Sequence, residues 1–493
     1  MITVFRFSPP SSSFTTTTSI TSSSSLKLKV VPKHPSFLRS RKSRRITTSR
    51  VSAEVAAPVT LDAFWKWVSD EGIISSKCPL QPTVVAEGLG LVAKRDISRN
   101  DVVLEVPKKF WINPDTVAAS DIGRVCGGLK PWISVALFLI REKKLKDKSK
   151  WRYYLDILPQ TTDSTLFWSE EELYQIRGSQ LLSTTRNVKQ YVQTEFEKLQ
   201  EEVIIPNNQL FPFQIQPEDF LWAFGILRSR AFSRLRGQNL VLIPIADLIN
   251  HSPDITTEEY AWEIKGGGIF SKELFFSLRT PVFVKAGQQV LIQYDLDKSN
   301  AELALDYGFT ENNPSRNAYT LTLQISESDQ FVGDKLDIAE LNKLGETASF
   351  DIVLGSPLPP MLLPYLRLVA LGGTDVFLLE SIFRNSIWGH LELPVSRSNE
   401  ELICKVVREA CTSALSGYLT TIEEDENLLE EGGLDPRVKT AVEVRAGEKK
   451  ILKQIDEIFE KRETELDELE YYQERRLKDL GLVGEQGEII FWE

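Results

Sequence analysis

The chain has 493 residues, of which 42% are hydrophobic and 26% are charged, and this length predicts two globular domains rather than one. No apolar stretch approaches the ~20 residues that a membrane-spanning helix requires, so no membrane association is expected. The formal net charge of −11 at pH 7 disfavours nucleic acid as the main partner, because binding to phosphates needs a basic surface.

The first fifty residues differ in composition from the rest of the chain. They are rich in Ser and Thr, carry ten Lys and Arg, and contain no acidic residue, since the first one is Glu54. This composition is typical of an organelle transit peptide, and the abundance of hydroxyl side chains favours a plastid over a mitochondrion. We therefore expect residues 1–53 to be a chloroplast transit peptide; a disordered basic tail is the alternative. Without these ten basic residues the net charge falls from −11 to −21, which fits a basic or lysine-bearing protein as partner.

Helical and β-type patterns alternate through the next part of the chain. Apolar residues at helical spacing, followed by a glycine, predict an opening helix over 60–72. Short β-type runs broken by Gly and Asn-Asp turns follow over 83–112, and the periodicity is helical from about 115 to 235. Strand signals return over 239–249 and again over 274–295. The pattern is that of a β-rich fold interrupted by a helical insertion.

The carboxy-terminal part reads as mostly helical. The cluster GFTENNPSRN (308–317) is a strong loop signal and marks the predicted domain boundary. A single strand is predicted over 318–325, followed by helices to the end of the chain. The long charged stretch over 445–483 has the Glu-to-Lys spacings of a solvated helix. Its apolar positions are too irregular for sustained heptads, so we expect a monomer.

The segment IADLINHSPD (245–254) reads as an apolar strand that breaks off at Asn250-His251-Ser252. The triplet matches the N-x-S glycosylation pattern, which requires secretion, and it could also be a simple turn. No metal site is expected, because His390 is the only other histidine beyond the first fifty residues. The four cysteines form no CxxC pair and are expected to be reduced, buried thiols.

Two further segments could carry chemistry. The glycines of AEGLGLVA (86–93) allow a tight turn, and since β-type residues follow them, a plain hairpin is favoured over a Rossmann cofactor site. A strand reads as ending at Tyr294-Asp295, and Tyr307 follows thirteen residues after Tyr294. Aromatic residues at strand ends usually belong to the core, so neither tyrosine alone indicates a function.

Taken together, the segments EGLGLVA, RSRAF, ADLINHS, IQYD and NAELALDYGF resemble the SET domain of protein lysine methyltransferases over residues 60–310. The helical insertion at about 115–235 and the helices that follow are similar to the Rubisco large-subunit lysine methyltransferases of plant chloroplasts. The resemblance implies an α+β fold: a SET-domain β-fold with a helical insertion, then a mostly helical substrate-binding domain over 318–493. It also implies an S-adenosylmethionine-dependent protein-lysine N-methyltransferase.

The resemblance assigns a role to individual residues. In SET domains the Asn-His segment threads under a neighbouring loop and forms a wall of the cofactor pocket. The residues implied to bind S-adenosylmethionine are Glu87, Gly88, Leu89, Arg230, Asn250 and His251. The residues implied to bind the substrate are Arg230, Arg234, Asp247, Trp262, Tyr294 and Tyr307. Tyr294 is the implied catalytic hydroxyl, and Trp262 departs from the tyrosine that relatives tend to carry.

The chemistry requires no metal, because the sulfonium of the cofactor is already an activated methyl donor. The enzyme must align the amine with the methyl group and supply lysine as a neutral amine, which an apolar tunnel favours by desolvation. SET domains that stop at one methyl tend to carry tyrosine two residues before the key tyrosine. Ile292 stands there instead and predicts transfer up to trimethyllysine.

The resemblance implies a chloroplast stromal protein as substrate, namely the Rubisco large subunit, fructose-bisphosphate aldolase, or both. A related enzyme class with this architecture methylates histidine in actin, so a histidine methyltransferase is one alternative. A binding module that has kept the fold without turnover is the other.

Overall fold

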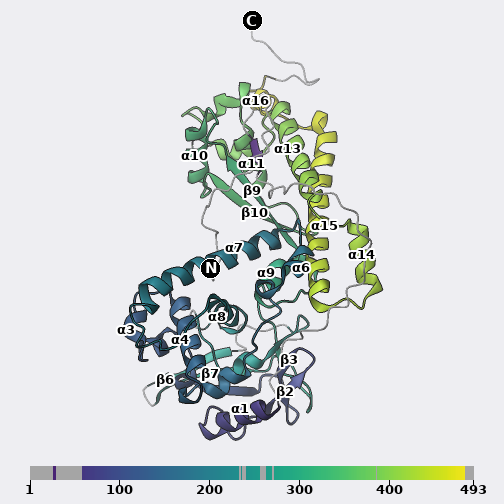
Figure 1. Ribbon diagram of the computed structural model, residues 1–493. Helices are drawn as coiled ribbons and strands as arrows, with labels where there is room; N and C mark the ends of the chain where they lie inside the picture. The colour runs from purple at the N-terminus through teal and green to yellow at the C-terminus, as the bar shows by residue number, and fades with distance from the viewer. Residues whose placement is uncertain are drawn as a thin grey trace.

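The computed structural model describes residues 26–28, 58–232, 235, 240–255, 262–268, 271–384 and 386–482. Its buried side chains form two hydrophobic cores. One core extends from Phe64 to Leu305 and also takes in Ala441 and Val444. The other extends from Tyr319 to Phe459. The two cores occupy the lower and upper halves of the molecule in Figure 1.

The lower half carries the β-structure expected of the first part of the chain. It begins with helix α1 and contains a hairpin (β2–β3), an antiparallel sheet of order β4-β7-β6, and a two-residue parallel pair, β5 with β8. The bounds are α1 Pro58–Asp70, β2 Leu80–Val85, β3 Gly88–Ala93, β4 Val102–Pro107, β5 Asn250–His251, β6 Trp262–Gly268, β7 Ser271–Arg279, β8 Leu291–Ile292 and α9 Asn300–Asp306.

The predicted helical insertion lies between β4 and β5. Its helices are α2 Pro114–Ala118, α3 Gly123–Cys126, α4 Pro131–Leu145, α5 Arg152–Ile157, α6 Glu170–Tyr174, α7 Gln180–Leu199 and α8 Pro217–Arg230. Trp132 of α4 packs against Phe220 and Phe224 of α8, with ring centroids 5.4 and 5.1 Å apart. This packing fixes the direction of α8, whose last residue, Arg230, reaches the site described below.

The upper half is mostly helical, as predicted, but its sheet contains two strands that the sequence analysis missed, β1 and β10. Strand β9 pairs antiparallel with both β10 and the short β1, which lies inside the segment predicted to be a transit peptide. The strands are β1 Leu26–Leu28, β9 Ala318–Ile325 and β10 Thr347–Val353. The helices are α10 Val332–Leu341, α11 Leu362–Ala370, α12 Ile387–Leu391, α13 Arg397–Leu415, α14 Ile422–Glu431, α15 Pro436–Thr464 and α16 Tyr472–Asp479.

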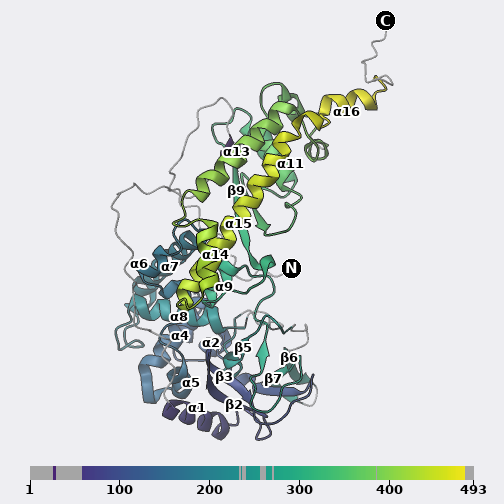
Figure 2. The same ribbon diagram turned by 90° about the vertical axis from the view of Figure 1, so that its right-hand side faces the viewer.

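Helix α15 spans both halves of the molecule (Figures 1 and 2). At its first half the Arg445 guanidinium donates to the carbonyl of Gln175 at 2.7 Å, and the Glu448 carboxylate accepts the backbone N–H of Gln180. The Gln180 side chain in turn exchanges two hydrogen bonds with the backbone of Thr320 in β9. The prediction of one solvated helix over 445–483 was therefore wrong. Helix α15 is mostly buried over 440–452, and it ends at Thr464 before α16 begins.

The prediction of a strand over 239–249 that breaks off at Asn250 was also wrong in part. Ala246–Leu248 form a 3-10 helix, and the extended residues are Asn250 and His251 themselves. Ile245 adopts a left-handed backbone with φ 71°, which redirects the chain before the strand. A continuous buried apolar run does not distinguish a strand from another buried conformation. Tyr294 lies two residues beyond β8 rather than at its end.

No single described helix is both long enough and apolar enough to cross a membrane; α11 and the following 3-10 helix, Gly373–Leu379, meet the criteria only as a pair bent by 116°.

Candidate active site

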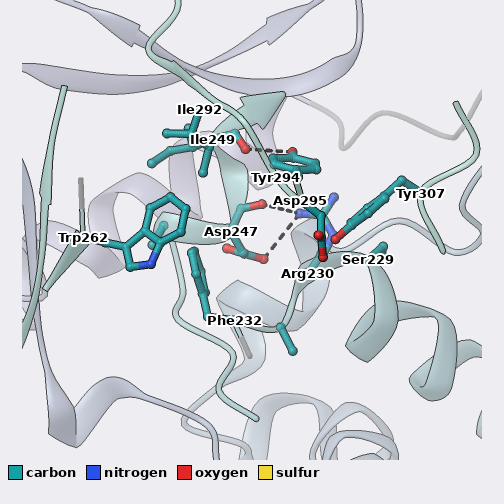
Figure 3. A pocket seen from close by; sticks show the side chains of 12 residues that line it. Ser229, Arg230, Phe232, Asp247, Ile249, Trp262, Ile292, Tyr294, Asp295 and Tyr307 are labelled. Carbon is teal, nitrogen blue, oxygen red and sulfur yellow. Dashed lines mark hydrogen bonds and ion pairs between the residues drawn. The ribbon is translucent and has the colours of Figure 1, made fainter. Parts of the chain in front are cut away.

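A narrow pocket of about 80 Å³ lies where the end of α8, the 3-10 helix before β5, and strands β6 and β8 converge (Figure 3). Its lining residues are Ser229, Arg230, Ala231, Phe232, Ala246, Asp247, Ile249, Trp262, Ile292, Tyr294, Asp295 and Tyr307. Aromatic and aliphatic groups form much of the wall, and a few polar groups converge on it. Such a pocket suits one extended side chain better than a large cofactor.

Most of the predicted substrate-binding residues meet at this pocket. Arg230, Asp247, Trp262, Tyr294 and Tyr307 all line it, although they come from five separate segments of the chain. The remaining predicted residue, Arg234, lies outside the described residues. Ile292, which was predicted to set the number of methyl groups, also lines the pocket and is 4% exposed.

Tyr294 presents a neutral hydroxyl at the pocket. Its O–H donates to the carbonyl oxygen of Ile249 at 2.8 Å, and its ring packs 5.1 Å from that of Tyr307. Burial raises the pKa of Tyr294 well above its usual value, with the Arg230 cation acting in the opposite direction. The phenol therefore stays protonated, and it acts as a hydrogen-bonding group rather than as a base.

Asp247 joins Arg230 and Tyr154 in a buried network. The Arg230 guanidinium donates to the Asp247 backbone carbonyl at 3.0 Å and lies 3.3 Å from carboxylate atom Oδ2, which also accepts the Tyr154 hydroxyl at 2.9 Å. Burial raises the pKa of Asp247, although Arg230 opposes this. The other carboxylate oxygen, Oδ1, is buried and has no hydrogen-bond partner in the described part of the chain. Asp247 lines the pocket, but its side chain is fully buried, so the carboxylate belongs to the network behind the wall.

The residues predicted to bind the cofactor gather next to this pocket. The Asn250 amide donates to the Leu89 carbonyl at 3.2 Å and to the Gln289 side chain at 3.0 Å. Gln289 then donates to the Glu87 carboxylate at 3.1 Å. A side chain at Gly90 would collide with Asn250 and Gln289, so the backbone approaches closely here.

The resemblance described above implies S-adenosylmethionine as the cofactor of this site. The cofactor has a carboxylate, an amine and an adenine edge. The Arg230 cation can pair with the carboxylate. The amine and the adenine edge can bond backbone groups of Glu87, Gly88 and Leu89, and the strand Asn250–His251 faces this hairpin. The residues present therefore fit the group.

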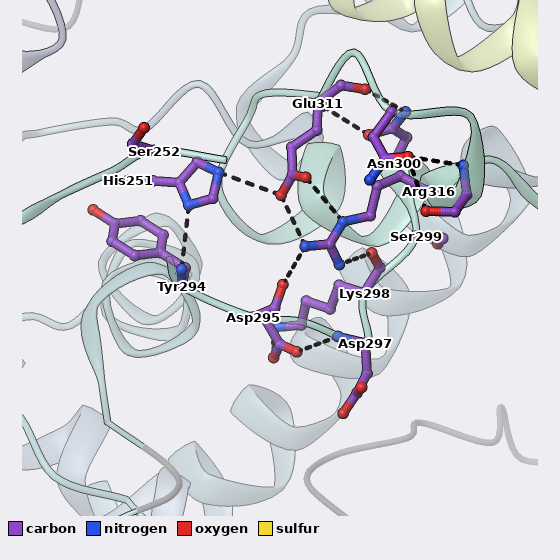
Figure 4. Close-up of polar contacts among 12 residues, drawn as sticks. His251, Ser252, Tyr294, Asp295, Asp297, Lys298, Ser299, Asn300, Glu311 and Arg316 are labelled. Carbon is purple, nitrogen blue, oxygen red and sulfur yellow. Dashed lines mark hydrogen bonds and ion pairs between the residues drawn. The ribbon is translucent and has the colours of Figure 1, made fainter. Parts of the chain in front are cut away.

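His251 is held in place by Tyr294 and by two residues that the sequence analysis did not identify, Phe309 and Glu311. Its Nδ1 accepts the backbone N–H of Tyr294 at 3.2 Å, and its ring stacks on Phe309 at 4.8 Å. Its Nε2 lies 3.3 Å from the Glu311 carboxylate (Figure 4). Burial lowers the pKa of His251, Glu311 opposes this, and the net direction is downward, so the imidazole is neutral near pH 7. Phe309 and Glu311 fall in the cluster 308–317, where the sequence indicated only a loop.

Lys298 supports the wall formed by Tyr307. Its ammonium lies 4.9 Å from the centre of the Tyr307 ring and 3.0 Å from the Asp306 carboxylate. Burial would lower the pKa of Lys298, but Asp306, Tyr307 and Asp295 outweigh it and raise the pKa above its usual value. A permanent cation therefore lies beside the pocket.

Within the described ranges no group of three or more His, Cys, Asp or Glu side chains could hold a metal ion. The four cysteines are free and buried, as predicted.

Comparison with known proteins identifies relatives along almost the whole chain. Residues 326–452 match the family described as Rubisco LSMT substrate-binding. The chloroplastic fructose-bisphosphate aldolase-lysine N-methyltransferase of Arabidopsis thaliana is 67% identical over 460 residues, which cover 93% of this chain and 95% of that protein. The chloroplastic Rubisco large subunit N-methyltransferase of Nicotiana tabacum is 63% identical over 496 residues, which cover 100% of both.

A solved structure agrees with these relatives. The crystal structure of the SET domain of LSMT bound to lysine and AdoHcy is 64% identical, has a TM-score of 0.83, and covers 87% of this chain and 97% of that one. The predicted fold class, cofactor and enzyme class are thereby confirmed. This chain belongs to the Rubisco large-subunit methyltransferase family of SET-domain, S-adenosylmethionine-dependent protein-lysine N-methyltransferases.

Proposed function

We propose that this protein methylates a lysine of the Rubisco large subunit, of fructose-bisphosphate aldolase, or of both, in the chloroplast stroma. The observation that carries the proposal is the narrow pocket at which a neutral tyrosine hydroxyl, Tyr294, lies beside the buried Arg230–Asp247 pair. S-adenosylmethionine supplies an activated methyl group when bound. Glu87, Gly88, Leu89, Arg230, Asn250 and His251 are the residues proposed to hold it.

The residues that line the pocket prepare the substrate lysine for attack. Free lysine has a pKa of ~10.4 and must lose a proton before it can attack. Trp262, Ile249 and Ile292 surround the amine with apolar groups, which disfavour its charged form. Asp247, held by Arg230 and Tyr154, lies near the substrate peptide, and the Tyr294 hydroxyl orients the amine for attack. Tyr307, braced by Lys298, closes the side of the pocket.

The number of methyl groups follows from Ile292. Its side chain is buried at the pocket wall and offers no hydroxyl to hold a water molecule against the amine. A methylated amine can therefore rotate and present its lone pair again. We propose that the product is trimethyllysine.

The remaining parts of the chain receive roles that agree with this activity. Residues 1–53 are proposed to direct import into the chloroplast, because both relatives described above are named as chloroplastic. Residues 318–493 are proposed as a substrate-binding domain, supported by the family match over 326–452. Residues 60–310 then form the catalytic SET domain. We propose that the protein acts as a monomer on a protein substrate, without nucleic acid or a membrane.

Two purified substrates test the proposal directly. Rubisco and aldolase are incubated separately with the full chain and labelled S-adenosylmethionine, and mass spectrometry identifies the labelled residue. We expect label on a lysine of at least one substrate, and loss of label with Tyr294→Phe but not with Tyr153→Phe, a change at a half-exposed tyrosine outside the pocket. Label on histidine would support the histidine alternative instead. Cofactor binding without label on either protein would support the non-catalytic alternative.

A further inference from the structure

A buried ion pair, Glu311 with Arg316, lies behind the pocket without lining it. The Arg316 guanidinium donates to both carboxylate oxygens of Glu311, from Nε at 3.0 Å and from Nη2 at 2.9 Å. The two residues are 6% and 5% exposed. Removing two charges from water is costly, and a buried pair of this kind need not stabilise the fold more than apolar residues would.

Each member of the pair contacts a different part of the active site (Figure 4). Glu311 faces His251, with 3.3 Å between Oε1 and Nε2. Arg316 donates from Nη2 to the backbone carbonyl of Asp295 at 2.7 Å and from Nη1 to that of Lys298 at 2.8 Å. These two carbonyls belong to the turn that follows Tyr294. One ion pair thus reaches the proposed cofactor wall and the segment that carries the proposed catalytic hydroxyl.

We propose that Glu311 and Arg316 are positioning residues for methyl transfer: Glu311 holds the ring of His251, a residue of the proposed cofactor wall, and Arg316 holds the turn after Tyr294. The inference rests on the proposed roles of His251 and Tyr294.

The hydrogen bond from the Tyr294 N–H determines which ring nitrogen of His251 carries the proton. Nδ1 accepts the Tyr294 N–H, so in the neutral ring the proton is on Nε2. Nε2 has no well-aligned hydrogen bond in the described part of the chain, and the contact with Glu311 is mainly electrostatic. A carboxylate on that side attracts the Nε2–H and keeps the ring turned toward Phe309, on which it stacks.

The pair is itself held by its surroundings. The Asn300 side chain brackets the backbone of Glu311: its oxygen accepts the Glu311 N–H at 2.8 Å, and its amide donates to the Glu311 carbonyl at 3.0 Å. On the other side, the Thr310 hydroxyl donates to Glu443 of α15, and Asn317 packs against Gly447 so closely that a Cβ there would clash. The position of the ion pair therefore depends on α15, the helix shared by both halves of the molecule.

Two substitutions separate the two halves of the proposal. Glu311→Gln keeps the shape and removes the charge that faces His251, so we expect S-adenosylmethionine affinity to fall about tenfold, with a smaller change in kcat. Arg316→Lys keeps a charge for Glu311 but cannot reach both carbonyls, so we expect kcat to fall about tenfold, with cofactor affinity within about threefold of wild type. Calorimetry gives the affinity. The kcat is measured on whichever of Rubisco or aldolase the wild-type protein methylates.

A spectroscopic measurement on the full chain, without cofactor, adds an independent readout. The chain has three histidines, so the imidazole resonances can be assigned individually. Glu311 raises and Arg316 lowers the pKa of His251, so Glu311→Gln should lower its NMR titration midpoint, whereas Arg316→Lys should leave it near the wild-type value.

A matched control is the buried pair Arg367–Glu400 in the upper half, whose side chains are 2% and 0% exposed. Glu400→Gln should reduce stability without moving the His251 midpoint, the cofactor affinity or kcat. The proposal is overturned if Glu311→Gln leaves the midpoint unchanged, or if all three variants alter affinity and kcat alike. Failure of the proposed function would show differently, as wild-type protein that binds no S-adenosylmethionine in the same calorimeter.

Discussion

Glu448 offers a test of how the two halves of the molecule are joined. This α15 residue is 2% exposed and accepts hydrogen bonds from the Tyr418 hydroxyl at 2.6 Å and from the backbone N–H of Gln180 at 3.0 Å. No cation pairs with it among the residues that the structure describes. Burial raises the pKa of Glu448 to about 7 from its ordinary 4.5, although these hydrogen bonds act in the opposite direction.

The direction of the pH effect follows from this raised pKa. Above pH 4.5 the unfolded chain releases the Glu448 proton, whereas the folded protein keeps it until about pH 7. The stability that Glu448 contributes is therefore fully present below pH 4.5 and is lost as the pH rises to about 7. A pKa difference of this size corresponds to about 3 kcal/mol.

The glutamine in the Glu448→Gln variant does not titrate, so the stability of the variant lacks this pH dependence. We therefore expect the unfolding free energy of the variant minus that of the wild type to rise by about 3 kcal/mol between pH 4.5 and pH 8. Urea denaturation followed by tryptophan fluorescence at several pH values measures this difference. Glu457→Gln, at an exposed position of the same helix, is the matched control. An identical difference between Glu448→Gln and wild type at pH 5 and pH 8 would refute the reasoning.

The remaining predictions concern the site and the leader. Tyr294→Phe should lower kcat far more than it weakens cofactor binding in calorimetry, because the hydroxyl acts mainly in the transition state. Ile292→Tyr should shift the product toward monomethyllysine, whereas wild type that stops there under excess cofactor would contradict our interpretation. Asn250→Ala should weaken calorimetric S-adenosylmethionine binding, each lost hydrogen bond costing roughly 1–3 kcal/mol; unchanged affinity would exclude the assignment. Residues 1–53 fused to a fluorescent reporter should enter chloroplasts, and a cytosolic reporter would disprove import.

The sequence by itself determined the features that depend on local pattern. Helical spacing over about 115–235 predicted an insertion that the structure contains between Pro114 and Arg230. Resemblance over five short segments was enough to predict the fold and the enzyme class, which the comparisons confirmed. It also named residues that the fold brings together, such as Asp247 and Trp262 at one pocket.

Only the tertiary structure decided which polar residues are buried and what they contact. Tyr154 and Asp247 are 93 positions apart, and no local spacing indicates that their side chains form a hydrogen bond. Glu311 and Arg316 lie in a cluster of Gly, Asn and Pro that is typical of a solvated loop, yet α15 and the turn after Tyr294 cover them. The spacing of apolar residues along the chain predicts local helices and strands. The burial and pairing of a charge depend on segments that meet only after folding.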